Sequence, residues 1–570
     1  MTTPELAAEH TAAVDRAVAE LVAGESAWAV RGLAERRELL ERVHAAVAEH
    51  AEAWVTAAAQ YKQLPADSPL LGEEWTAGPF SVLSATAALV ETIRALEAGR
   101  SPVEGFPVRP APGGRIAVKV LPHDLQERLM FSGFSAEVWM PPGVTEAEAR
   151  QRAGLGLLNP AKTGGVGVVL GAGNVTSIPV LDVLYELYAN NRVAALKLNP
   201  VTDGLAGVYA DALAPLIEAG AVRVLTGGVD VGGYLVNHPD VSHVHMTGSA
   251  ATHDAIVFGP GEEGAARRAA NTPVLDKPVT SELGGVSPVI VLPGEWSEAD
   301  LRFQAEHVAT QRLHNNGYNC VASQVLVLSA DWPQKDRFLA LLRETFDSAP
   351  ERPAYYPGSD NRLALALDAY PSAHAQGGRV LIDGLDPAEP GPALRTEYFA
   401  PVLAVIELPG TGREFLDEAV RTANEDCAGT LGVNILAHPK TLSSLGAAFD
   451  EALAALRYGT IAVNAWTGFG YQTARAPWGA FPGHTLDDVQ SGIGVVHNAL
   501  LLDGPERTVV RGPFRPAPRS VLHGEPALSP RPPWFVTNRT AATTGRRLVG
   551  YAAERRWSAL PGVVTSALRG

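Results

Sequence analysis

Apolar residues recur every three or four positions along the first hundred residues, with glutamate and arginine between them. This spacing gathers the apolar side chains on one face of a helix. The residues that set the pattern are Leu6, Val14, Ala17, Leu21, Leu33, Leu39, Leu40, Val43 and Val47. A segment rich in proline and glycine, from Pro102 to Gly114, interrupts it. We therefore predict amphipathic helices that end before this segment.

Two runs with alternating polar and apolar residues follow, from Arg115 to Pro122 and from Ser135 to Pro141. Alternation with a period of two is typical of a strand with one buried and one exposed face. The runs predict a pair of antiparallel strands whose exposed face is available for pairing with another subunit.

From about Gly164 the pattern changes to short β-branched runs separated by helical patterns. The runs cover residues 166–170, 194–198, 222–226, 241–247 and 286–292. Strands that alternate with helices predict a parallel sheet covered by helices, the architecture of nucleotide-binding α/β domains. A second α/β stretch covers residues 301–465. Prolines crowd the last seventy residues, which predicts an extended tail ending in a basic helix around Arg546 to Arg556.

Composition narrows the class of protein. The 570 residues carry a formal net charge of −16, which disfavours general binding to nucleic acid or to an anionic membrane. The two cysteines, Cys320 and Cys427, exclude a disulfide framework and fit a reducing compartment. No apolar run reaches the roughly 18 residues of a membrane helix, and the first residues lack the apolar core of a secretory signal. A soluble, cytoplasmic, multidomain protein is expected.

Three residues are candidates for chemistry. Cys320 follows a glycine in the run His314–Val321, so its sulfur could face a cleft from a tight turn, although a buried structural thiol is the alternative. Glu282 precedes two glycines at the start of a strand and could act as a general base, or be a simple loop acid. Asn174 follows the strand 166–170 and could donate to an oxyanion, or cap a turn.

Other polar residues lie at strand ends. Lys197 ends the run 194–198, and Ser249 follows Gly248 where a helix could begin and meet a phosphate. A lysine at a sheet edge and a plain helix cap are the alternatives. His243 and His245 share one face of a strand, but the pair lacks a third metal ligand in the sequence, so no metal site is predicted.

Taken together, these motifs resemble those of the aldehyde dehydrogenase superfamily in order and spacing. The ordered set is GAGN, KLNP, MTGS, ELGGVSP, GYNC, EYFAPVL and APWGAFPG, and it covers roughly residues 150 to 500. The resemblance implies an α/β fold with a Rossmann-like cofactor domain, an α/β catalytic domain and a small β oligomerisation element. It divides the chain into N-terminal helices of the cofactor domain (1–114), oligomerisation strands (115–141), the cofactor-binding domain (142–285), the catalytic domain (286–480), a return to the cofactor domain with an oligomerisation strand (481–505) and a proline-rich tail of unknown role (506–570).

The resemblance also implies roles for single residues. Cys320 would be the nucleophile, Asn174 an oxyanion donor and Glu282 the base that activates water. Lys197, Gly248, Ser249, Glu397 and Phe399 would bind NAD or NADP, and Trp478 would form a wall of the substrate tunnel. A small-molecule aldehyde would be the substrate, and the subunits would form a homodimer or homotetramer.

One departure from the family pattern bears on the cofactor. The family often has a glutamate three residues after the lysine, where this chain has Pro200. Loss of that carboxylate removes a repulsion against a 2′-phosphate, which permits NADP. Two alternatives to hydrolytic aldehyde oxidation stay open. They are transfer of the acyl group to coenzyme A, or its reverse, and a degenerate scaffold that binds nucleotide without turnover.

Overall fold

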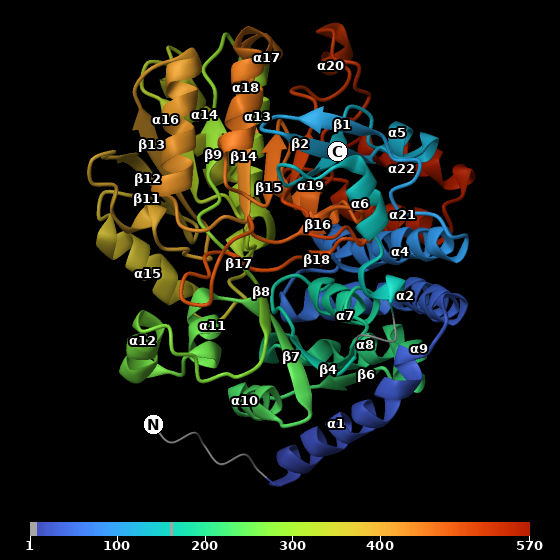
Figure 1. Cartoon of the computed structure of the whole chain (residues 1–570). Coiled ribbons are helices and arrows are strands. Elements are labelled where there is room, and N and C mark those ends of the chain that lie inside the picture. Colours follow the sequence, from blue (N-terminus) through green and yellow to red (C-terminus); the bar gives the residue numbers. More distant parts are fainter. Residues whose placement is uncertain (1–7, 160–163) are drawn as a thin grey trace.

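The computed structural model describes residues 8–159 and 164–570. Over these residues the strands form a six-stranded sheet, an eleven-stranded sheet and a two-stranded ladder. We call the six-stranded sheet the first sheet and the eleven-stranded sheet the second sheet. The two lie next to each other, each flanked by helices (Figure 1). The molecule is thus a mixed α/β protein, as the sequence predicts.

Helices occupy the N-terminal region as the apolar spacing predicts. They are α1 (Ala8–Ala29), α2 (Leu33–Tyr61), α3 (Leu71–Trp75), the π-helical turn η1 (Thr76–Phe80) and α4 (Ser81–Glu97). The predicted stripe of α2 is buried, with Leu40, Val43 and Val47 fully shielded from solvent. Leu6 lies outside the described residues. The packed stripes join the core beside the first sheet.

The first sheet has the strand order β17-β8-β7-β4-β5-β6. Its strands are β4 (Val166–Leu170), β5 (Val193–Lys197), β6 (Val222–Leu225), β7 (Val241–Gly248), β8 (Val279–Leu283) and β17 (Gly492–Ile493). All neighbours are parallel except β17. Helix α7 (Ile178–Tyr188) covers one face, and α1 and α10 (Val229–Asn237) cover the other (Figure 1). Burial on both faces explains why the strands read as nearly continuous β-branched runs.

The second sheet has the order β1-β2-β3-β19-β15-β14-β9-β10-β13-β12-β11. From β19 to β12 the strands are parallel, and the outer strands are antiparallel. The bounds are β1 (Val108–Ala111), β2 (Arg115–Leu121), β3 (Ser135–Met140), β9 (Val289–Val291), β10 (Val325–Ser329), β11 (His374–Gln376), β12 (Arg379–Leu385), β13 (Val402–Leu408), β14 (Gly432–Leu436), β15 (Thr460–Val463) and β19 (Arg507–Arg511).

The remaining elements connect and cover the two sheets. Around the first sheet lie α8 (Ala206–Ala212), α9 (Ala214–Glu218), α11 (Ala250–Val257) and α12 (Gly261–Ala269). Around the second sheet lie α13 (Glu298–Leu313), α14 (Lys335–Ser348), α15 (Ser359–Ala369), α16 (Gly412–Glu425), α17 (Pro439–Leu445) and α18 (Ala447–Ala455). The connecting pieces include α5 (Leu125–Met130), α6 (Glu146–Arg152), α19 (Thr467–Gln472) and the ladder of β16 (Pro477–Trp478) with β18 (Val496–His497).

The predicted strand pair exists as β2 and β3, which pair in antiparallel register. The expectation of one exposed face is wrong, because Lys119 and Glu137 on the polar face are only partly exposed and Ala117 and Trp139 beside them are fully shielded. Ala117 and Trp139 pack into the core of the second sheet. At the edge of the pair, β19 pairs with β3 and joins it to β15 of the same chain. The terminal strands of the second sheet are β1, which contains Pro110, and β11.

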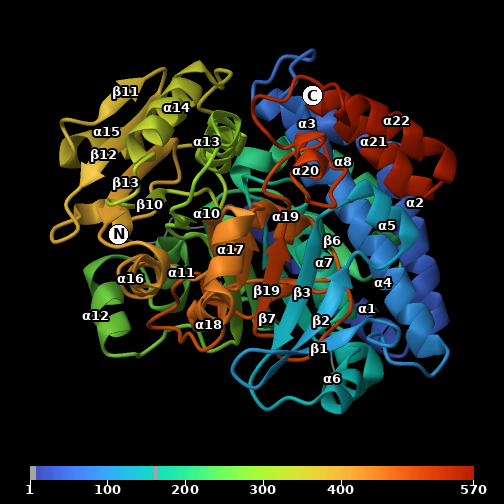
Figure 2. The same cartoon turned by 90° about the horizontal axis from the view of Figure 1, so that it is seen from above.

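The C-terminal region is not an extended tail over its whole length. It contains β19, the short helix α20 (Arg519–Leu522), α21 (Ala541–Glu554) and α22 (Leu560–Ala567), so the predicted basic helix is present. Helix α21 packs on α3 and η1 (Figure 2). A Cβ atom added at Gly545 would lie 2.7 Å from the Cβ of Trp75. Glycine therefore permits the close approach of the two helices.

One helical stretch, Leu71–Glu97, has the length and apolar character of a membrane span, with a mean hydropathy of 1.2. Buried residues make up 61% of the relevant window. A core helix of a globular protein passes the same test, so this stretch is weak evidence for a membrane. The packing of α4 against α2 accounts for its apolar character.

Candidate active site

Cys320 lies just after α13, on a sharply folded loop. Asn315, Asn316 and Gly317 all have positive φ, which makes the tight turn that the sequence suggested. The buried guanidinium of Arg312 donates to the carbonyls of Gly317 and Ala322, both at 3.0 Å, and so clamps the loop. Cys320 itself is partly exposed, whereas Cys427 is buried. The loop therefore presents one of the two cysteines to an opening.

Asn174 braces the cysteine loop from the first sheet. It follows β4, and its Nδ2 donates to the carbonyl of Tyr318 at 2.9 Å. In return, Asn315 Nδ2 donates to the carbonyl of Asn174 at 3.1 Å. The structure thus brings Asn174 within two residues of Cys320 along the loop. An amide nitrogen carries two hydrogens, so one N–H of Asn174 is left for a second acceptor.

Glu282 lies near the end of β8 and faces Cys320. Trp478 Nε1 donates to its Oε1 at 3.2 Å, while Oε2 has no hydrogen-bond partner in the described part of the chain. Burial raises the pKa of Glu282 to about 7; the Asp182 carboxylate adds to the rise, whereas hydrogen bonds from Cys320 and Trp478 oppose it. A carboxyl group with a pKa near neutrality is suited to accept and release protons.

The cysteine is surrounded by negative rather than positive groups. Burial raises the pKa of the Cys320 thiol well above its ordinary value, and Glu282 and Glu397 raise it further. A positive neighbour or a helix N-terminus would favour the thiolate form of a cysteine. Over residues 8–159 and 164–570 the surroundings instead favour the neutral thiol, so a base is needed to activate it.

Glu397 and Phe399 lie on the loop before β13. Burial raises the pKa of Glu397 to about 8, opposed by Arg312 and increased by Glu282. Glu397 Oε1 is buried and accepts no hydrogen bond from any described residue, and it packs against Gly284, where a Cβ atom would lie 2.0 Å away. Phe399 lies in a ring cluster with Tyr318 and Tyr356. Glu397 therefore joins Cys320 and Glu282 in one chamber.

The other predicted cofactor residues lie at the carboxyl ends of strands in the first sheet. Lys197 ends β5 and is buried; burial lowers the pKa of this lysine, which Asp203 and Asp230 partly offset. Gly248 ends β7, and Ser249 caps α11 by accepting a hydrogen bond from the Thr252 N–H at 3.2 Å. In parallel sheets this edge is where ligands bind.

Several residues near the site escaped the sequence argument. Tyr471 packs against Trp478 and hydrogen-bonds through its hydroxyl to Ser177 at 2.6 Å. Asp182 lies on α7 and hydrogen-bonds with Thr247 of β7. One feature of the sequence could have pointed to Asp182. Asp182 and Glu186, four residues apart, are acidic residues in an otherwise apolar helix.

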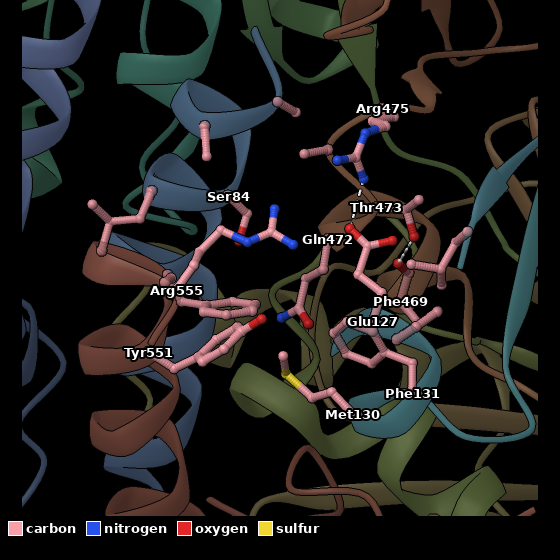
Figure 3. A pocket seen from close by; sticks show the side chains of 17 residues that line it. Ser84, Glu127, Met130, Phe131, Phe469, Gln472, Thr473, Arg475, Tyr551 and Arg555 are labelled. Carbon is pink, nitrogen blue, oxygen red and sulfur yellow. Dashed lines mark hydrogen bonds and ion pairs between the residues drawn. The ribbon is translucent and has the colours of Figure 1, made fainter. Parts of the chain in front are cut away.

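An apolar cavity of about 80 Å³ lies between α4, α5, α19 and α21. Figure 3 shows Phe131, Phe469 and Tyr551 around it, with the ion pair of Arg475 and Glu127 at one end. Neither Cys320 nor Glu282 lines this cavity. It is a separate feature, built partly by the C-terminal helix α21.

Comparisons with known proteins agree with this geometry. The family model described as "Aldehyde dehydrogenase family" matches residues 163–360, which contain Asn174, Lys197, Glu282 and Cys320. The 3,6-anhydro-alpha-L-galactose dehydrogenase of Streptomyces coelicolor is 28% identical over 359 residues, which cover 62% of this chain and 58% of that protein. The aminoacetaldehyde dehydrogenase of Pseudomonas aeruginosa is 28% identical over 46% of this chain and 51% of its own length. The chain thus spans about half the length of the curated relatives it matches.

Solved structures share the fold. A mutant of aldehyde dehydrogenase C from Pseudomonas syringae, in complex with NAD⁺ and octanal, aligns with a TM-score of 0.59 and 19% identity over 89% of this chain and 90% of that one. An NADP-dependent glyceraldehyde-3-phosphate dehydrogenase from Bacillus halodurans C-125, complexed with NADP, aligns with a TM-score of 0.57 and 18% identity over 88% and 91%. Residues 163–360 are thus similar to the aldehyde dehydrogenase family, and the chain shares the fold of solved aldehyde dehydrogenases.

Proposed function

We propose that this protein oxidises a small-molecule aldehyde to a carboxylic acid, with NAD or NADP as the oxidant, through a thioester on Cys320. The observation that carries the proposal is the convergence of Cys320, Glu282 and Asn174 from three separate segments. A nucleophile, a base with a pKa near 7 and an amide donor are the groups that covalent aldehyde oxidation needs.

Glu282 performs the first proton transfer. Because its pKa is about 7, roughly half of it is ionised at neutral pH and can accept the proton of the Cys320 thiol. The thiolate then attacks the aldehyde carbon and forms a thiohemiacetal. The oxygen of this adduct becomes negative, and the free N–H of Asn174 with the backbone N–H of Cys320 would stabilise it.

The chamber fits a dinucleotide at two points. The buried Glu397 Oε1 lacks a donor in the described part of the protein, and a ribose hydroxyl would supply one. Lys197, Gly248 and Ser249 lie at the strand ends where the rest of the dinucleotide would be held. NAD or NADP would supply the hydride acceptor for the reaction when bound there.

Glu282 also serves the second half of the reaction. The ionised carboxylate takes a proton from water, the hydroxide attacks the thioester, and the carboxylic acid leaves as the sulfur regains its charge. The Trp478 N–H fixes one carboxylate oxygen and leaves Oε2 free for this step. The retained and oriented base favours hydrolysis over acyl transfer to coenzyme A.

The charge around Lys197 bears on the choice between NAD and NADP. Pro200 leaves the position three residues on without a carboxylate, which permits a 2′-phosphate. Asp203 and Asp230 nevertheless act electrostatically on Lys197. These two carboxylates would oppose a phosphate there, so we propose that they limit the affinity for NADP.

A homodimer or homotetramer remains a proposal. Proline in the edge strand β1 removes one N–H donor, so pairing of two chains along this edge is disfavoured. Light scattering on the purified protein would give the mass, and a monomer would contradict the proposed assembly.

The activity is tested by following cofactor reduction with a panel of aldehydes. We expect turnover by the wild-type protein, background rates for Cys320→Ala and retained turnover for Cys427→Ala. The second variant is a matched control, since it removes the other, buried cysteine. Full activity of Cys320→Ala would overturn the proposal.

A further inference from the structure

Ionisable side chains fill the layer between α7 and β7, where apolar contacts are the rule. Asp182 and Glu186 lie one turn apart on α7, and His243, His245 and Thr247 alternate along one face of β7. The side chains of both acids and both histidines are at most 4% exposed. Burying four such groups is costly unless they pair. The activity described above uses none of them directly.

The four groups form two carboxylate–imidazole pairs joined by one hydroxyl. His245 Nε2 lies 3.4 Å from Asp182 Oδ2, and His243 Nδ1 lies 3.4 Å from Glu186 Oε2. Thr280 Oγ1 lies 2.9 Å from His245 Nδ1 and 3.4 Å from His243 Nε2. A hydroxyl can accept one proton while it donates another, so Thr280 links the two imidazoles.

The inner end of this chain reaches the proposed base. Strands β7 and β8 are parallel neighbours in which Thr247 pairs with Glu282 and His245 pairs with Thr280. Thr280 and Glu282 are two residues apart on β8 and therefore point to the same face of the sheet. Thr247 donates to Asp182 Oδ2 at 3.1 Å, and the charges of both Asp182 and His245 act on Glu282. Asp182 Oδ1 and Glu282 Oε2 are both buried without a partner among the described residues.

The outer end of the chain reaches solvent. Arg192 lies 3.1 Å from Glu186 Oε2, and the arginine side chain is 25% exposed. Asn190 Nδ2 donates to the other oxygen of Glu186 at 3.2 Å. Glu186 thereby stays ionised: although burial opposes it, the hydrogen bond and charge of His243 with Arg192 lower its pKa to about 2. The ionised Glu186 carboxylate compensates the positive charge of a proton that passes through His243.

We propose that His245, Thr280 and His243, held by Asp182 and Glu186, form a relay that carries the proton away from Glu282 after each deprotonation step. The inference rests on the proposed function, because it needs Glu282 as the base. Glu282 gives its proton to His245 Nε2, and His245 gives its Nδ1 proton to Thr280. Thr280 then gives its own proton to His243 Nε2, and His243 releases one at the Glu186–Arg192 edge. The net result is an ionised Glu282 and one proton in solvent, with His245 and His243 in the opposite tautomers and the Thr280 hydroxyl reoriented. Rotation of the two imidazoles and of the hydroxyl returns the relay to its starting state before the next proton.

Electrostatics suit His245 to this task. Burial alone would lower the pKa of His245, but Asp182 and the other nearby carboxylates raise it above the ordinary histidine value. The remaining imidazole facing this layer, His497, has a pKa lowered by burial to about 4 and stays neutral. His245 therefore accepts a proton more readily than its neighbour.

The test separates formation of the acyl-enzyme from its hydrolysis. His245→Gln and Asp182→Asn remove the first proton acceptor or its partner, and Ser242→Ala is the control on the exposed face of the same strand. Single-turnover reactions with an aldehyde and oxidised cofactor are quenched at intervals, and the adduct mass on Cys320 is followed. We expect adduct formation within threefold of wild type, hydrolysis at least tenfold slower, and recovery of hydrolysis when imidazole is added.

Hydrolysis at the wild-type rate in both variants would overturn the relay. Equal slowing of formation and hydrolysis without recovery by imidazole would also overturn it, because a structural role affects both steps. Absence of any Cys320 adduct in the wild-type protein would instead refute the proposed function. The melting temperature of each variant shows whether it folds. If one of the two variants misfolds, the other is sufficient for the test.

Discussion

Trp478 Nε1 donates a hydrogen bond to Glu282 Oε1 at 3.2 Å inside a buried chamber. This contact joins the two-stranded ladder of β16 and β18 to the first sheet, and it stabilises the charged form of the base. Burial pushes the pKa of Glu282 up and the indole N–H pulls it down. The balance near 7 therefore depends on Trp478.

Trp478→Phe should move the pH dependence of turnover to higher pH. Loss of a donor to a charged group is worth about 1.5 kcal/mol, which corresponds to about one pH unit. The rising limb of kcat against pH measures the shift. Trp466→Phe is the control, because the Trp466 Nε1 has no partner within the described residues. Identical limbs for Trp478→Phe and wild type would contradict the assignment.

Glu282→Gln should stabilise the protein at alkaline pH. The folded pKa of about 7 lies above the ordinary value of 4.5, so the stability that Glu282 contributes at low pH is lost as pH rises through 7. Above pH 7 the neutral glutamine avoids a buried charge worth up to about 3 kcal/mol. Melting curves should diverge more at pH 8.5 than at pH 5.5. The exposed Glu295→Gln should show no such divergence.

Asn174→Ala should lower kcat by about 10²- to 10³-fold, as is typical for loss of one oxyanion donor. The same side chain braces the loop through Tyr318, so loop damage must be told apart from loss of the donor. The rate of Cys320 alkylation by iodoacetamide makes the distinction. An unchanged alkylation rate with reduced kcat supports donation, whereas a parallel change in both indicates loop damage.

Removing Asp203 and Asp230 should favour NADP. Replacing both with asparagine takes two negative charges from the surroundings of Lys197. We expect the ratio of dissociation constants for NADP and NAD to fall about tenfold, or about 1.4 kcal/mol. Asp211→Asn, an exposed residue of α8, is the control. An unchanged ratio would show that the 2′-position lies elsewhere.

Gly545→Ala should destabilise the docking of α21. The added methyl group would lie 2.7 Å from the Cβ of Trp75 and 3.2 Å from the carbonyl of Gly72. Gly550→Ala, in the same helix, meets no atom within 4 Å and should stabilise by about 0.5–1 kcal/mol through helix propensity. Thermal melting of the two variants should therefore shift in opposite directions.

Local patterns of apolar and polar residues were sufficient to predict much of the fold. The α2 stripe, the pair β2 and β3 and the parallel strands of the first sheet all follow from periodicity. Strand β19 did not, because Arg507–Arg511 is a short run flanked by charges, and its pairing with β3 and β15 is non-local. Without that strand, β2 and β3 look like a free ribbon. The covering of their polar face at Ala117 and Trp139 is likewise non-local, because both residues pack into the core of the second sheet.

In the candidate site, too, the sequence predicted the residues but not the properties that depend on non-local packing. Motif order indicated Cys320, Glu282 and Asn174 as partners, and the structure places them together. The raised pKa of Cys320 could not be predicted from the sequence. It depends in part on Glu397, and a long loop determines how close Glu397 lies to the cysteine. The pairing of His245 with Asp182 likewise depends on how α7 lies across β7.

The most direct test of the central claim is the mass of the intact wild-type protein, quenched with acid during a single turnover with an aldehyde and oxidised cofactor. We predict one transient acyl group that peptide mapping places on Cys320, and slower formation of the same group in Glu282→Gln, because Glu282 also deprotonates the thiol. No adduct, or an adduct on another residue, would contradict the proposed covalent oxidation.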